Sequence, residues 1–269
     1  MQDTGKNRNT RDQFYTKSTV SKLCVDAILS NIPDACKFKW VEPSAGNGSF
    51  LNNVPSGFDK QGIDIDPKSK DIAQADFMEW EYDSDKPCIL FGNPPFGRQS
   101  SLAKQFIKRG CEFADIIAFI LPRSFLKPSM TNAFDRLFHC KTTIELDKDS
   151  FELNGVAYDV PCIFQIWVKE DSPRILESKI NPIGFKYVKD NYDIAFRRVG
   201  GLAGKCYLPG QLNPQCYYFW KLDSEFVSFI PEIIKKMNEH VFPSNTVGPR
   251  SLSKSEANKV MNHILKNLS

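Results

Sequence analysis

The sequence predicts an α/β fold in which a doubly wound, mainly parallel seven-stranded sheet carries helices on its faces. Short apolar segments recur through the first 170 residues, and stretches that can hold helices separate them. The last segment is apolar enough to cross the interior of a sheet. The expected strands are Phe38–Glu42, Gly62–Asp66, Ile72–Asp76, Cys88–Phe91, Ile116–Leu121, Thr142–Leu146 and Pro161–Lys169.

Two helices are predicted from apolar residues at helical spacing. The first covers Ser18–Ser30, and its expected buried face is Val20, Leu23, Cys24, Ala27 and Ile28. The second covers about Ser100 to Phe113, and its expected inward residues are Leu102, Phe106, Ile107 and Cys111.

The pattern changes beyond Glu170, where prolines interrupt the chain and periodicity weakens. We therefore expect three parts: a polar, mobile leader over residues 1–13, a large domain over 14–170 and a small region over 171–269. Near the end, Ser253 and Glu256 have the spacing of a capping box that starts a helix. The expected inner face of that helix is Val260, Met261, Ile264, Leu265 and Leu268.

Composition narrows the class of protein. The 269 residues are 41% hydrophobic and 25% charged, which is ordinary for a globular chain. No apolar run approaches the length of a membrane helix, and the polar N-terminus does not resemble a signal peptide. The eight cysteines form no CxxC pair, so we expect reduced thiols and no metal site. These features predict a cytoplasmic or nuclear protein that is not secreted and has no membrane partner.

The net charge of +3 permits binding to a polyanion. Basic residues gather in the leader, after the large domain and in the tail. Arg197, Arg198 and Lys205 follow the large domain, and Arg250, Lys254, Lys259 and Lys266 lie in the tail. Their alternative role is to form solvated faces.

The most specific motif is the tetrapeptide Asn93-Pro94-Pro95-Phe96, which follows the apolar run Cys88–Phe91. The prolines fix the backbone near φ −65° and leave carbonyl oxygens free to accept hydrogen bonds. The lone pair of an exocyclic aromatic amine is delocalised, and two acceptors can localise it. Asn93 Oδ1 and the Pro94 carbonyl would accept its two N–H groups, and Phe96 would stack on the ring. The motif therefore predicts methylation of a planar nitrogen.

Three upstream segments have the pattern of a nucleoside pocket. The stretch from Glu42 to Phe50 ends the first strand with a Gly-x-Gly turn before an expected helix. Asp64 ends the next strand, where carboxylates bind ribose hydroxyls, while Asp66 is expected to brace the following turn. Asp76 is a candidate acceptor for a cofactor amino group, or a turn carboxylate, beside the lining residues Phe77 and Ile65.

In this order the motifs resemble class I S-adenosylmethionine-dependent methyltransferases, and within them N6-adenine DNA methyltransferases of gamma motif order. The matching stretch runs from Asp12 to about Lys169 and includes Leu121-Pro122-Arg123. The resemblance implies a Rossmann-like fold, S-adenosyl-L-methionine as cofactor and nucleic acid as partner, DNA being favoured over RNA. Residues 14–170 would be the catalytic domain and 171–269 a small target-recognition or accessory region.

The resemblance also implies roles for individual residues. Tyr15, Thr16, Glu42, Ala45 and Gly46 would hold the methionine end of the cofactor. Asp64 would bind its ribose, and Ile65, Asp76 and Phe77 its adenine. The residues Asn93, Pro94, Pro95 and Phe96 would act on the target, with Asn93 also against the cofactor. A later aromatic would stack on the other face of the extruded base; Phe151 matches best, Tyr158 is second, and core packing is the alternative for Phe151.

The sequence departs from the family in size, because only about 100 residues follow the catalytic part. A short recognition site, a structured RNA or a protein partner that supplies specificity would fit that size. Two other functions stay open. Protein glutamine N5 methyltransferases also use an Asn-Pro-Pro-aromatic motif, and a non-catalytic subunit could present nucleic acid to an active partner. N4-cytosine enzymes more often carry Ser at the position of Asn93.

Overall fold

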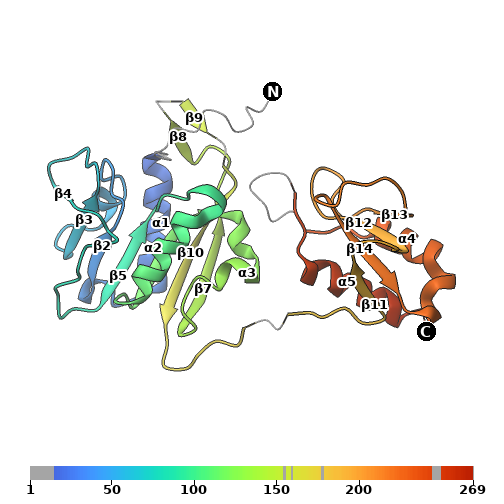
Figure 1. Ribbon diagram of the computed structural model, residues 1–269. Coiled ribbons are helices and arrows are strands. Elements are labelled where there is room, and N and C mark those ends of the chain that lie inside the picture. Colours follow the sequence, from blue (N-terminus) through green and yellow to red (C-terminus); the bar gives the residue numbers. More distant parts are fainter. Residues whose placement is uncertain (1–14, 154–155, 159, 177–178, 244–249, 269) are drawn as a thin grey trace. The chain divides into compact units, whose positions relative to one another are not determined.

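The computed structural model describes residues 15–153, 156–158, 160–176, 179–243 and 250–268. The chain forms two units, Met1–Leu176 and Glu177–Ser269, each with a core of its own (Figure 1). The division lies a few residues beyond the change of pattern at Glu170. None of the helices in the described ranges combines the length and the apolar character that a membrane span requires.

The first unit is built on the predicted seven-stranded sheet, with strand order β4-β3-β2-β5-β6-β10-β7. Its strands pair in parallel, except that β10 runs antiparallel to both β6 and β7. The strands are β2 (Lys39–Glu42), β3 (Lys60–Asp64), β4 (Ile72–Gln74), β5 (Cys88–Gly92), β6 (Ile116–Pro122), β7 (Phe138–Glu145) and β10 (Cys162–Lys169). The doubly wound, Rossmann-like α/β class is confirmed.

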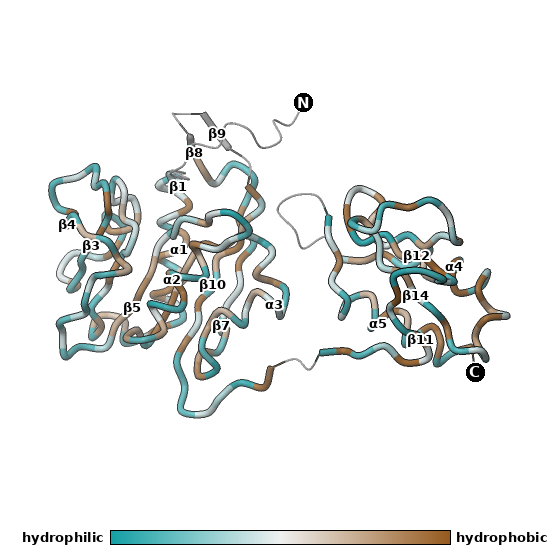
Figure 2. Tube along the Cα trace, in the orientation of Figure 1, coloured by the Kyte–Doolittle hydropathy of each residue, from teal (hydrophilic) through white to brown (hydrophobic). Residues whose placement is uncertain are grey.

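Two hydrophobic cores lie on the two faces of this sheet, because successive side chains of a strand point to opposite faces. In β5, Ile89 and Phe91 belong to one core, while Cys88 and Leu90 belong to the other. Both sets are fully buried, so β5 reads as a continuous apolar run rather than an alternating one. Figure 2 shows the hydrophobic colouring along this central strand.

Helix α1 (Ser18–Asn31) covers one face, and α2 (Ser101–Cys111) with the short α3 (Pro128–Thr131) covers the other. Both long helices were predicted, but two of their expected inward residues are exposed, Leu23 by 45% and Leu102 by 38%. The turn of α2 that carries Leu102 lies at the rim of the cavity described below. Spacing identifies a helical face but not where that face leaves the core.

The sequence predicts helices in the connections between β2 and β5, and this prediction is wrong. In the described chain these connections contain only the 3-10 turn Leu51–Asn53. The connection from β2 to β3 carries Gly48, Pro55 and Gly57, and only seven residues separate β3 from β4. Glycine and proline disfavour helix interiors, and seven residues leave little room for a helix between two strand ends.

A second, three-stranded sheet joins distant parts of the first unit. It consists of β1 (Tyr15–Thr16), β8 (Phe151–Leu153) and β9 (Val156–Tyr158), with Thr16 paired opposite Phe151. The start of the described chain is thereby tied to the segment that precedes β10.

The second unit contains a four-stranded antiparallel sheet of order β11-β14-β12-β13. Its elements are β11 (Phe185–Val188), β12 (Ile194–Arg197), β13 (Cys206–Tyr207), β14 (Tyr217–Leu222), α4 (Ile230–Glu239) and α5 (Lys254–Lys266). Trp220, Met237 and Met261 lie in the core between this sheet and the two helices. The predicted capping box is present: Ser253 Oγ accepts from Glu256 N, and the Glu256 carboxylate accepts from Ser253 N. Of the predicted inner face of α5, Met261, Ile264 and Leu265 are buried.

Candidate functional site

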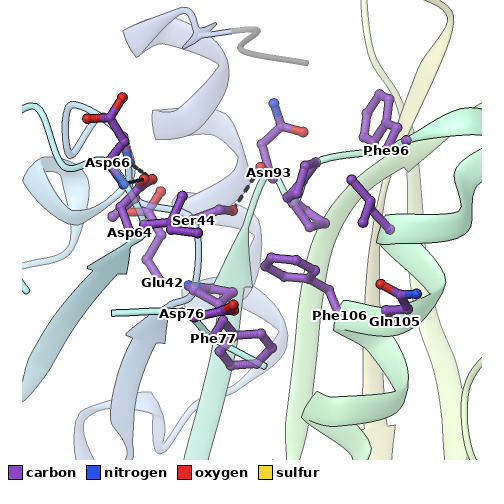
Figure 3. Close-up of a pocket in the computed structure, with 18 of the residues that line it drawn as sticks. Glu42, Ser44, Asp64, Asp66, Asp76, Phe77, Asn93, Phe96, Gln105 and Phe106 are labelled. Carbon is purple, nitrogen blue, oxygen red and sulfur yellow. Dashed lines mark hydrogen bonds between the residues drawn. The ribbon is translucent and has the colours of Figure 1, made fainter. Parts of the chain in front are cut away.

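A cavity of about 1160 Å³ opens where β2, β3 and β5 end. Ligands of open α/β sheets bind at this carboxyl edge, because the loops that follow parallel strands converge there. Every residue assigned above to the cofactor pocket and to the tetrapeptide lines this one cavity. They are Tyr15, Thr16, Glu42, Ala45, Gly46, Asp64, Ile65, Asp76, Phe77, Asn93, Pro94, Pro95 and Phe96. The carboxylates Asp64 and Asp66 lie on one side and Phe96 and Phe106 on the other (Figure 3).

The carboxylate of Asp64 fixes the backbone of the loop after β2. One carboxylate oxygen of Asp64 accepts from Gly46 N at 2.7 Å, and the other accepts from Asp66 N at 2.8 Å. Gly46 has φ +52°, and an added Cβ would lie 3.4 Å from Cε1 of Tyr15. The backbone therefore passes under the Tyr15 ring without a side chain of its own. The Asp66 carboxylate pairs with Lys68 in the same turn at 2.8 Å.

Glu42, at the end of β2, is the buried acid of the cavity, with 2% of its surface exposed. Its Oε2 accepts from Leu51 N at 3.2 Å. Burial raises the pKa of Glu42 well above its ordinary value, the Leu51 hydrogen bond opposes this shift, and the negative charge of Asp64 adds to it. A cationic group that entered the cavity beside Glu42 would favour the ionised form.

The tetrapeptide is anchored at Asn93 by both its backbone and its side chain. Ser44 Oγ donates to the Asn93 carbonyl at 3.1 Å, which joins the loop after β2 to the loop after β5 (Figure 3). Asn93 Nδ2 donates to Thr16 Oγ1 at 3.2 Å. With its Nδ2 used in this way, the amide presents Oδ1 as its acceptor atom.

The segment after the tetrapeptide is conformationally unusual. Gln99 (φ 53°) and Ser100 (φ 60°) both adopt left-handed backbone conformations, which cost about 1–3 kcal/mol each for residues other than glycine. The first amides of α2 offset part of this cost, because Leu102 N and Ala103 N donate to the Phe96 carbonyl at 3.2 and 3.3 Å. The half-buried Phe96 also packs against both cores of the first unit. Strain of this kind is concentrated at functional sites.

At the other end, the cavity is lined by Ile65, Asp76, Phe77 and Phe106. Ile65 is 68% exposed at its mouth. Asp76 Oδ1 accepts from Met78 N at 2.9 Å, so this carboxylate also supports a turn. Phe77 is only 2% exposed, because Phe106 stacks on it with ring centroids 5.0 Å apart.

Several cavity residues were not identified from the sequence as site residues. They include Ser44, Met78, Arg98, Leu102, Gln105 and Phe106. Phe106 was assigned to the core because its spacing fits the inward face of α2. The available signal was position: four residues separate the tetrapeptide from the start of α2, so the first two turns of α2 lie near the same space.

For Phe151 the structure favours the core-packing alternative. The sequence makes it the best match for an aromatic that stacks on the target base, but the side chain is 1% exposed and belongs to a core cluster. Its place in β8 opposite Thr16 leaves no open ring face, so Phe151 contributes packing. The side chain of the second candidate, Tyr158, and the motif residues Asp12 to Phe14 lie outside the described part of the chain.

No family model and no curated protein matches this sequence. Among solved structures, the chain is similar to a protein of Pyrococcus horikoshii assigned as an RNA methyltransferase (15% identity, TM-score 0.47, covering 61% of this chain and 90% of that one). It is also similar to a protein of Listeria monocytogenes assigned as a class I S-adenosylmethionine-dependent methyltransferase (15% identity, TM-score 0.46, covering 64% of this chain and 65% of that one). A third is the methyltransferase subunit of a type I restriction-modification system from Streptococcus thermophilus (13%, 0.42, 94% and 57%).

The chain spans less than two thirds of the Listeria and Streptococcus structures. At identities of 15% or below and TM-scores below 0.5, these likenesses decide nothing about substrate. The description of the fold depends on the order and direction of the strands.

Proposed function

We propose that this chain is an S-adenosyl-L-methionine-dependent methyltransferase that modifies the N6 amine of adenine in nucleic acid, with DNA favoured over RNA. The observation that carries the proposal is the single cavity that brings the cofactor motifs together with Asn93, Pro94, Pro95 and Phe96. Its volume suits a nucleoside cofactor with part of a base.

The residues present fit that cofactor on chemical grounds. Gly46 provides a stretch of backbone without a side chain, Glu42 a buried acid for an ammonium group, and Asp64 a carboxylate for ribose hydroxyls. At the other end, Ile65 and Phe106 would enclose a flat base and Asp76 would accept from its amino group. When bound, S-adenosylmethionine supplies an electrophilic methyl group on a sulfonium.

The tetrapeptide would prepare the adenine amine. Asn93 Oδ1 and the Pro94 carbonyl accept one N–H each, which draws the nitrogen towards tetrahedral geometry and frees its lone pair. The amine held by these two acceptors would take the methyl group, and its surplus proton would then pass to solvent. Phe96 stacks on the base and favours the positive charge that develops on nitrogen. Positioning contributes the rest of the rate enhancement.

A base inside a duplex must first leave the stack, at a cost of a few kcal/mol. The second unit would help to hold the polymer during this step, either alone or with a protein partner that supplies site specificity. An adenine in a structured RNA is the nearest alternative substrate.

The test is incubation of the protein with labelled S-adenosylmethionine and DNA, RNA or a glutamine-containing polypeptide, followed by analysis of the nucleosides and peptides. We expect N6-methyladenine. Label only in glutamine would favour a protein glutamine methyltransferase, and no label on any substrate, with cofactor bound, would favour a non-catalytic subunit. Asn93→Ala should bind the cofactor within a few-fold of the unmodified protein and turn over roughly 100- to 1000-fold more slowly.

A further inference from the structure

Positive charge is unevenly divided between the two units. Residues 177–269 contain 13 lysines and arginines and 8 aspartates and glutamates, a formal charge of +5. Residues 1–176 contain 22 lysines and arginines and 24 aspartates and glutamates, a formal charge of −2. The excess of cations therefore belongs to the smaller unit, which lacks the cavity. Such an asymmetry favours an anionic partner for that unit.

Three of these cations lie over tyrosine rings. Arg197 and Tyr217 are cross-strand partners in β12 and β14, with the guanidinium carbon 5.6 Å from the ring centroid. Arg198 lies 5.4 Å from the centroid of Tyr218. Lys254 Nζ, at the start of α5, lies 5.9 Å from the same ring.

Lys254 also contacts a third ring, since its Nζ lies 4.3 Å from the centroid of Tyr187. Burial and hydrogen bonds hold the rings in place: Tyr187 Oη donates to Asn258 Oδ1 at 2.6 Å, and Tyr218 Oη donates to the Leu252 carbonyl at 3.2 Å. Each ring is half-buried, while Lys254 is exposed. The rings thus serve as platforms that orient the cations, of which Lys254 is exposed and the two arginines are half-buried.

The backbone brings these residues together from three segments. Leu252 N donates to the Arg198 carbonyl, and Gly200 N donates to the Arg250 carbonyl, both at 2.8 Å. A bridge between Val199 and Ser251 lies between these two bonds. The end of β12, the start of β14 and the segment that leads into α5 are therefore fixed side by side.

Ion pairing does not explain this gathering of charge. Arg197 donates to the Val199 carbonyl at 3.2 Å and to Tyr217 Oη at 3.3 Å, and Arg198 donates to the Gln215 carbonyl at 3.1 Å. Among the described residues, no ion pair involves Arg197, Arg198 or Lys254. The carboxylate of the neighbouring Glu256 is engaged by Ser253 N and Oγ at 2.8 and 2.7 Å. A lysine at the first position of α5 also adds to the positive end of the helix dipole rather than offsetting it.

We infer that this cation–tyrosine cluster binds the phosphate backbone of the nucleic acid that the first unit methylates. The cluster consists of Arg197, Arg198, Lys254, Tyr187, Tyr217 and Tyr218. The inference rests on the proposed function and names the residues that engage the polymer. Because the cations cover the tyrosine rings, the rings do not stack on bases. The cluster contacts phosphates through its cations and therefore does not select a base sequence.

The test is fluorescence anisotropy with a labelled DNA duplex, without cofactor, across a series of salt concentrations. The variant Arg197→Gln, Arg198→Gln, Lys254→Gln should bind at least about tenfold more weakly. The logarithm of the binding constant falls with the logarithm of the salt concentration, and the slope of this line should become shallower by roughly 2 to 3. Each lost phosphate contact reduces the magnitude of the slope by about 0.9.

The matched control is Lys186→Gln, Lys235→Gln, Lys259→Gln, which removes the same charge from exposed positions of the same unit that touch none of the three rings in the contacts described. It should keep most of the affinity and most of the slope. Equal losses in the two variants would reduce the effect to net charge and overturn the inference. The charge-preserving variant Arg197→Lys, Arg198→Lys should restore most of the binding, and unchanged circular dichroism would show that the unit still folds.

The two proposals fail in different ways. If the duplex binds through the cluster but no N6-methyladenine forms, the function is wrong and the surface is right. If adenine is methylated and the glutamine variant binds like the unmodified protein, the surface is wrong. Binding of polyglutamate but not of DNA, with the same dependence on these cations, would also overturn it.

Discussion

Asn93 and Thr16, 77 residues apart in the sequence, are joined by a hydrogen bond of 3.2 Å from Asn93 Nδ2 to Thr16 Oγ1. Thr16 is itself held in β1 opposite Phe151. The side chain that is proposed to accept from the target amine is therefore oriented by a strand outside the main sheet. Displacing Thr16 would rotate the amide without removing it.

Thr16→Val should separate positioning from binding. Valine keeps the shape and the β-branch but cannot accept from Nδ2, so the Asn93 amide loses its orientation. We expect turnover to fall roughly 10- to 100-fold, as small misplacements of reacting groups do. The measurement is kcat for methyl transfer beside cofactor affinity by calorimetry. Thr16→Ser keeps the hydroxyl and should stay within a few-fold; equal losses in both variants would contradict the role of this hydrogen bond.

Glu42 should make stability depend on pH. Burial raises the pKa of Glu42, so between its unfolded pKa near 4.5 and its higher folded pKa the folded protein holds one more proton than the unfolded chain. Stability contributed by this group is present at low pH and is lost as pH rises from the unfolded pKa towards the higher folded pKa.

Glu42→Gln replaces the titratable carboxyl group by an uncharged amide and keeps the shape of the side chain. The free energy of unfolding of the variant should exceed that of the unmodified protein at pH 7, and the difference should vanish below about pH 4. Urea unfolding at several pH values measures it. A difference that stays constant with pH, or grows as pH falls, would contradict the raised pKa. Cofactor binding should weaken in the same variant, since the acid proposed to meet its ammonium group is lost.

The sequence predicts the sheet well because buried parallel strands need apolar runs that few other structures tolerate. Cys88–Phe91 and Ile116–Leu121 lie within β5 and β6 for this reason. Helices between β2 and β5 were predicted wrongly, because a stretch that can hold a helix has no reason to form one unless it can cover the core. Local patterns carry little information about that choice.

For the site, the sequence supplied positions at strand ends and could not supply neighbours. Asp64 and Gly46 were identified separately, but the 2.7 Å bond between them comes from the parallel pairing of β2 with β3. Phe106 and Phe151 show the opposite limit. Helical spacing assigned Phe106 to the core and the family resemblance assigned Phe151 to the target base, yet Phe106 borders the cavity and Phe151 lies in the core. Only the packing of the whole unit separates the two cases.

Gly46→Ala should weaken cofactor binding beyond its effect on stability. At φ +52°, any other residue costs about 1–2 kcal/mol, and its Cβ would contact the Tyr15 ring and narrow the backbone approach. Gly57→Ala is the control, since Gly57 has φ +89° and no atom within 4 Å of an added Cβ. Both variants should lose stability in thermal melts, but only Gly46→Ala should lose affinity for S-adenosylmethionine. Equal affinities would mean that the ligand does not pass close to Gly46.

Phe106→Ala tests a residue of the cavity lining that the sequence did not reveal. Phe106 and Phe113 both pack on Phe77, with centroids 5.0 and 6.1 Å away, but only Phe106 lines the cavity. Both alanine variants should lower the melting temperature, because each removes an aromatic contact from the same ring. The cofactor dissociation constant should rise about tenfold in Phe106→Ala, which is ~1.4 kcal/mol, and stay nearly unchanged in Phe113→Ala. If both dissociation constants rise equally, Phe106 acts by supporting Phe77, and the flat ring of the cofactor lies elsewhere in the cavity.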